Sequence, residues 1–75
     1  MNTYLVTLAD RTTGEDQRIL VQSSDSDGMQ EFVDSDEVRP TLRLITPVVI
    51  AIHQLRVKRP PQRTNFVALE KTPQR

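Results

Sequence analysis

The chain contains no cysteine and only one histidine among its 75 residues. The absence of cysteine excludes disulfides, a thiolate nucleophile and cysteine-based zinc sites, and one histidine is too few for a histidine-rich metal site. The longest strongly apolar run, about Val48–Ile52, is much shorter than the roughly 20 residues that a membrane-spanning helix needs. The first residues also lack the basic and then apolar stretch of a secretion signal. We therefore expect a soluble cytoplasmic protein that does not contact a membrane.

The sequence also lacks the motifs that accompany catalysis. Its two glycines form no loop that could cradle a phosphate, and its serines lie in no nucleophile-elbow motif. His53 lies in an apolar segment and has neither a nucleophile nor an orienting acid close to it in the sequence. We therefore predict that the protein is not an enzyme and uses no cofactor.

The length and composition of the chain allow one small domain. A chain of this size buries only about 60% of its unfolded surface, so we expect a thin margin of stability. Apolar residues make up 36% of the sequence and charged residues 27%. We predict a single α+β domain over residues 1–58, followed by a proline-rich basic segment over 59–75 that has room for an edge strand before a frayed end.

The net charge of zero conceals an uneven distribution of charge along the chain. The first 37 residues hold nine acidic and two basic side chains, whereas the remainder holds eight basic side chains and one acidic side chain. The two halves either neutralise each other when they fold together or form opposite patches, one of which meets a charged partner.

Two segments near the start of the chain alternate between apolar and polar residues. Thr3–Ala9 and Gln17–Gln22 have the period of two that is typical of strands, and the polar stretch between them contains Gly14. We therefore predict a β-hairpin.

Matching the apolar faces of this hairpin predicts its register. We expect Leu8 to lie beside Ile19 and Val6 to lie beside Val21. Leu5 and Leu20 are expected to share the opposite face of the hairpin.

A short helix is predicted from about Asp27 to Asp36. Met29, Phe32 and Val33 recur at helical spacing, and Asp27 is suited to cap the first turn, with Gln30 completing a weak capping box. The Arg39-Pro40 pair is expected to end the helix, because the residue before a proline avoids the helical region.

The most apolar segment, Val48–Val57, admits two interpretations. The preceding Thr46-Pro47 resembles the start of a helix, but the segment is rich in β-branched residues, so we predict a strand. Asn65–Leu69 is expected to form one more edge strand. The predicted fold is thus a small antiparallel sheet with one short helix packed on one face, in the order β-β-α-β, with an additional C-terminal strand.

One segment resembles the calcium loop of the EF-hand family. Ser23, Asp25, Asp27, Gly28 and Asp34 follow its spacing. The family has Asp where this chain has Ser23 and a bidentate Glu where it has Asp34, and the preceding segment is predicted to be a strand rather than a helix. A run of small polar residues is also usual before a helix. Weak calcium binding is therefore the third functional hypothesis, and we assign no metal site.

The basic segment near the C-terminus provides a second hypothesis, a nucleic-acid-binding regulator. Basic side chains beside Pro60-Pro61 could contact phosphates, but the chain has few aromatic residues on which bases could stack. The candidate residues are Arg56, Lys58, Arg59 and Arg63.

The leading hypothesis is a protein-binding module. The size, the opening hairpin and the charge pattern resemble the short α+β proteins that bacteriophages and other mobile elements encode to inhibit or redirect host machines, among them RNA polymerase regulators and anti-CRISPR proteins. The resemblance implies a partner that is a larger host protein or protein–nucleic-acid complex, bound through a charged or apolar surface. The candidate residues are the acidic set Asp25, Asp27, Glu31, Asp34, Asp36 and Glu37 and the apolar pair Leu5 and Leu20.

Overall fold

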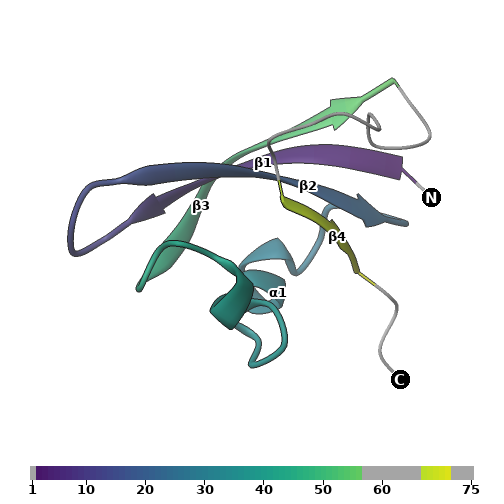
Figure 1. Cartoon of the computed structure of the whole chain (residues 1–75). Helices are drawn as coiled ribbons and strands as arrows, with labels where there is room; N and C mark the ends of the chain where they lie inside the picture. Colours follow the sequence, from purple (N-terminus) through teal and green to yellow (C-terminus); the bar gives the residue numbers. More distant parts are fainter. Residues whose placement is uncertain (1, 57–66, 72–75) are drawn as a thin grey trace.

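The computed structural model describes residues 2–56 and 67–71. Along the chain these residues form strands β1 (Asn2–Asp10) and β2 (Asp16–Ser23), helix α1 (Met29–Asp34), a short 3-10 helix η1 (Arg39–Thr41), and strands β3 (Pro47–Leu55) and β4 (Val67–Glu70) (Figure 1). The structure belongs to the α+β class that the sequence predicts, and strands dominate it.

The four strands form one mixed sheet in the order β3-β1-β2-β4. β1 pairs antiparallel with both β2 and β3, whereas β4 pairs parallel with β2. The prediction of an antiparallel sheet is therefore wrong at β4. Alternation of side chains reports which face a strand buries, but the direction of a strand depends on how the chain returns to it. Because β4 joins the sheet, the sheet extends beyond residue 58.

The hairpin of β1 and β2 forms as predicted, but its register differs by two residues. Val6 lies opposite Ile19, and Leu8 lies opposite Gln17. An even shift keeps every side chain on its predicted face, which is why the apolar pattern cannot detect it. The loop sets the register: the Asp10 amide donates to the Glu15 carbonyl at 2.7 Å.

Helix α1 is shorter than predicted at both ends, and its N-terminal cap differs. It begins after Gly28, which has a φ of 67° and provides no side-chain cap. The prediction that Asp27 caps the helix is wrong, because its amide donates to Oδ1 of Asp25 at 3.0 Å. Gln30 does not complete a capping box either, since its side chain turns toward β3.

The segment after α1 also departs from expectation. Ser35 caps the end of α1, where its amide and its hydroxyl both donate to the Phe32 carbonyl. Arg39-Pro40 does not end α1; it begins η1, with the proline in the first turn, where a missing N–H costs nothing.

The strand interpretation of the apolar segment is confirmed by β3, and its helical alternative is wrong. The Thr46 hydroxyl donates to the Asp10 carboxylate instead of accepting from a helix amide. The register of β3 against β1 shifts between Thr7 and Leu8, which is a β-bulge.

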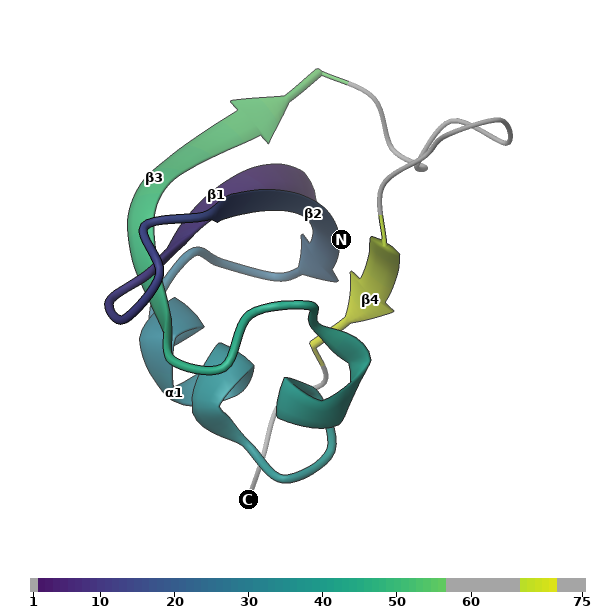
Figure 2. The ribbon, with the colours of Figure 1, turned by 60° about the vertical axis from the view of Figure 1, so that its left-hand side comes forward.

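A single hydrophobic core lies between the sheet and the segments after β2. The sheet is curved, and α1 and η1 cover its concave face (Figure 2). One short helix therefore packs on one face, as predicted. The buried core residues are Tyr4, Val6, Leu8, Ile19, Val21, Met29, Val33, Val38, Leu42 and Leu44. Within the described ranges no helix is long and apolar enough to cross a membrane.

Candidate functional site

Six carboxylates lie together along the chain on and around α1. All six residues are exposed, and they occupy the loop before α1, the helix itself and the turn that follows it. The apolar side of α1 fixes their position, because Met29 and Val33 are buried in the core. We call this set the acidic surface; it consists of Asp25, Asp27, Glu31, Asp34, Asp36 and Glu37.

Few cations balance the acidic surface. Among residues 2–56 and 67–71 there is one ion pair, in which Lys71 Nζ lies 3.8 Å from Oδ1 of Asp25. No basic residue occupies the last turn of α1, where Asp34 opposes the helix dipole. Within the described part of the chain, the other five carboxylates therefore form no ion pair with the basic half of the sequence.

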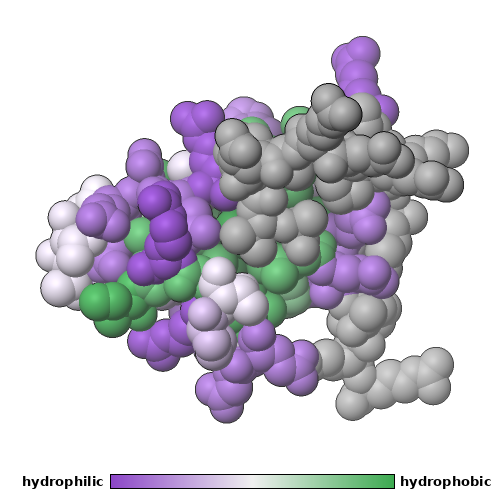
Figure 3. Space-filling model, in the orientation of Figure 1, coloured by the Kyte–Doolittle hydropathy of each residue, from purple (hydrophilic) through white to green (hydrophobic). Residues whose placement is uncertain are grey.

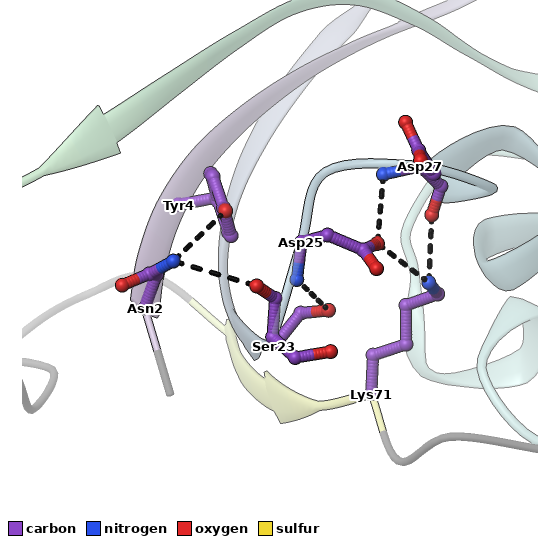
Figure 4. A network of polar contacts seen from close by, with 7 residues as sticks. Asn2, Tyr4, Ser23, Asp25, Asp27 and Lys71 are labelled. Carbon is purple, nitrogen blue, oxygen red and sulfur yellow. Dashed lines mark hydrogen bonds and ion pairs between the residues drawn. The ribbon is translucent and has the colours of Figure 1, made fainter.

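A polar network ties the loop before α1 to the end of β4 (Figure 4). Ser23 Oγ accepts from the Asp25 amide at 3.3 Å, and Asp25 Oδ1 accepts from the Asp27 amide at 3.0 Å. The Lys71 ammonium group donates to the Asp27 carbonyl at 2.6 Å. This segment is the one that resembles a calcium loop, and here a lysine of the same chain supplies its positive charge. The described residues contain no group of three acidic, histidine or cysteine side chains that could hold a metal ion.

The Gln30 side chain joins α1 to the sheet edge. Its Nε2 donates to the Pro47 carbonyl at 3.1 Å and to Asp34 Oδ2 at 3.1 Å, while its Oε1 accepts from the Val49 amide at 2.9 Å. The amide thus satisfies backbone groups at the start of β3 as a neighbouring strand would. It also holds one carboxylate of the acidic surface close to that edge.

The two predicted apolar residues of the second sheet face differ in accessibility. Leu5 and Leu20 lie directly opposite each other, as their shared face predicts. Leu20 is only 2% exposed, whereas Leu5 is partly buried. The prediction that both residues meet a partner does not fit this burial, because Leu20 has almost no surface to offer.

The larger apolar side chains that reach the surface lie elsewhere. Ile45, which precedes β3, is 65% exposed, and Ile50 and Ile52 within β3 are 59% and 36% exposed. Hydrophobic atoms emerge among hydrophilic ones on the face shown in Figure 3. The sequence predicted a strand over Val48–Val57, but none of these exposed apolar residues was among the predicted binding residues.

Of the predicted basic residues, the structure describes one. Arg56 is exposed just beyond the end of β3. Lys58, Arg59 and Arg63 lie outside the described residues, and nucleic-acid binding by this segment stays a prediction. His53 is exposed on β3, and its side chain makes no hydrogen bond to another described residue.

Asp10 is a buried carboxylate that the sequence analysis did not single out. It is 4% exposed, and its Oδ1 accepts from the Thr12 and Thr13 amides and the Thr46 hydroxyl, while Oδ2 accepts from the Ile45 amide. The Ile45 and Thr46 hydrogen bonds hold the pKa of the Asp10 carboxyl well below its usual range, against the opposing effect of burial. Asp10 therefore acts as an ionised anchor between the hairpin loop and the loop before β3.

Two further side chains hold the loop before β3. The Gln17 side chain accepts from the Arg43 amide at 2.9 Å, and the Arg39 guanidinium donates to the Ile45 carbonyl at 2.9 Å. These contacts explain why the polar loop stays packed while its Leu42 and Leu44 enter the core.

Comparison of the chain with protein-family models, with curated proteins and with solved structures finds no match.

Proposed function

We propose that the protein is a small non-enzymatic binding module that docks on a larger host protein or protein–nucleic-acid complex and inhibits or modulates it. The acidic surface is the part that docks. In this proposal the chain works as the small inhibitors and regulators of bacteriophages and mobile elements do.

One observation carries the proposal: the six carboxylates of the acidic surface are exposed on and around α1, and five of them have no described counterion. Such a surface attracts a basic patch, and complementary charge raises the association rate and selects among partners. It suits a protein that normally binds the phosphates of a nucleic acid, because it presents a row of negative charges in their place. The two carboxylates on α1 support this role, since the buried Met29 and Val33 hold the helix that carries Glu31 and Asp34.

The test is a pair of charge reversals that leave the fold intact. Asp36→Lys with Glu37→Lys changes the turn after α1, and Glu15→Lys with Asp16→Lys makes the same change of charge at the junction of the hairpin loop and β2, where both side chains are also exposed. Exposed charges alter stability by less than about 0.5 kcal/mol, so both variants should fold.

Capture from a bacterial lysate, quantified by mass spectrometry, identifies partners of the wild-type chain, and association rates are then measured with the purified partner. We expect the Asp36/Glu37 variant to associate at least about tenfold more slowly, and the hairpin-loop variant to behave as wild type. Equal capture by both variants would show that the acidic surface is not the docking site.

A further inference from the structure

Strand β3 forms an edge of the sheet that lacks the usual protection against pairing. None of its nine residues is charged, and no strand of the described residues pairs with its outer side. Native edge strands commonly carry charged side chains, an interior proline or a β-bulge, which hinder addition of another strand. The second half of β3, after the bulge at Ile50, has none of these, and it exposes Ile52.

The orientation of its backbone groups follows from the pairing across the sheet. The Lys71 amide donates to the Gln22 carbonyl at 2.8 Å, so the backbone groups of Gln22 face β4. The backbone groups of successive residues in a strand point to opposite edges of the sheet. Because the partners of each residue are known, the orientation at Gln22 fixes the orientation in β1 and then in β3. The N–H and C=O groups of Ile52 and Gln54 consequently point away from β1.

Only the start of this edge is occupied. Gln30 satisfies the Pro47 carbonyl and the Val49 amide. No other described side chain hydrogen-bonds to the outward groups of Ile52 and Gln54, so the second half of the strand offers free donors and acceptors for pairing.

We propose that the second half of β3 pairs antiparallel with β3 of a second copy of this chain, about a twofold axis at Ile52. Each Ile52 then faces Ile52 of the other copy, and each Gln54 faces the bulge at Ile50. An uncharged strand can meet itself in this way without placing like charges opposite each other. The contact is isologous and closes at two copies, which an edge paired head to tail would not do.

Charge complementarity identifies the occupant as a second copy. Counted across the extra residue at the bulge, Arg56 of one copy lies opposite Pro47 of the other, and continuing the alternation of Ile52 and Gln54 places Arg56 on the face that α1 covers. Asp34 of α1 is connected to Pro47 through the Gln30 amide. Asp34 and Arg56 therefore lie near opposite ends of β3, and antiparallel pairing of two copies brings each Arg56 close to an Asp34.

The proposal does not rest on the docking function described above: it shares only Asp34 with the acidic surface, and the docking test changes Asp36 and Glu37. The chain has no cysteine, so a single Ile52→Cys substitution provides a specific probe. Cysteines that face each other in an antiparallel pair lie within disulfide distance. We expect rapid formation of a disulfide-linked dimer from Ile52→Cys under mild oxidation, and slow cross-linking from Ile45→Cys, whose side chain is more exposed but lies outside β3.

Sedimentation velocity supplies the second measurement. We expect the wild-type chain to dimerise, Asp34→Lys and Arg56→Glu each to weaken dimerisation at least about tenfold, and the double variant to regain most of the loss. A wild-type chain that stays monomeric at NMR concentrations, equal cross-linking of the two cysteine variants, or a double variant as weak as the single ones would each overturn the proposal. None of these outcomes bears on partner capture by Asp36 and Glu37.

Discussion

At the scale of single residues, Asp10 shows how one carboxylate connects distant parts of a small fold. Four donors from two loops converge on it, and no basic side chain is involved. Hydrogen bonds to an ionised acceptor are stronger than those between neutral groups. The anchor therefore depends on the charge of Asp10, which gives it a dependence on pH.

Replacing Asp10 by asparagine should lower the stability of the protein and its sensitivity to acid. The amide keeps one acceptor oxygen but directs N–H groups at a donor, so we expect a lower midpoint of thermal unfolding at neutral pH. Asp16→Asn is the control, because the Asp16 side chain is exposed and the residue is bonded only through its carbonyl.

The sign of the pH effect follows from the lowered pKa of Asp10. Its carboxylate stabilises the fold at every pH above the unfolded pKa of about 4, and this contribution is lost as the pH falls toward the folded value. Urea unfolding measured between about pH 5 and pH 2 should show a steeper loss of free energy for wild type than for Asp10→Asn. Parallel curves would mean that Asp10 does not anchor the loops as a charged group.

Sequence reasoning could not find this residue. An aspartate that starts a polar loop is usual in a turn, and the Thr12 and Thr13 contacts are of that local kind. The Ile45 and Thr46 donors come from 35 residues or more along the chain. Only the tertiary structure brings them to the same carboxylate.

At the scale of elements, the six-residue helix α1 is too short to persist on its own and depends on its contacts. Met29 and Val33 bury one side of it, and the Gln30 amide ties it to β3. The helical spacing of the apolar residues predicted the first kind of contact. It could not predict the second, because the partners of Gln30 are backbone groups.

Gln30→Met should weaken the attachment of α1 to β3 while keeping the length of the side chain. Loss of the bonds to Pro47 and Val49 should reduce the free energy of unfolding by about 1–2 kcal/mol. The Val49 amide should also exchange its hydrogen faster, as NMR would show. Glu31→Met, at the next and exposed position, should change neither the free energy of unfolding nor the exchange rate appreciably. An equal effect of Glu31→Met would mean that helix propensity, and not the hydrogen bonds of Gln30 to β3, causes the loss.

At the scale of the whole molecule, the fold is supported by a core to which the described residues contribute ten buried apolar side chains. A chain of this length has a total stability of roughly 4–11 kcal/mol. The sequence predicted the α+β class and the face of each hairpin strand, since these depend on composition and alternation. The parallel direction of β4 and the exposed edge of β3 depend on how the strands are joined and paired, which alternation does not encode.

Two leucines of β1 lie on opposite faces of the sheet, and replacing each of them tests which face carries the core. Leu8 is fully buried, whereas Leu5, three positions earlier on the other face, is partly buried. Leu8→Ala should reduce the free energy of unfolding by about 3 kcal/mol, and Leu5→Ala should cost clearly less. Denaturant unfolding of both variants measures the difference; similar losses would place a substantial part of the core on the second sheet face.

The parallel pairing of β4 also has a consequence for the order of folding. Partners in the β1–β2 hairpin are close in sequence, whereas Ile19 of β2 pairs with Val67. Closing a longer loop costs more chain entropy, and here it gains only four residue pairs. We therefore expect the hairpin to form early and β4 to dock last, followed by the closure of Lys71 onto the loop before α1. In this order a newly synthesised chain would pass through a stage in which both sides of the sheet are open, and the arrival of β4 would close one of them.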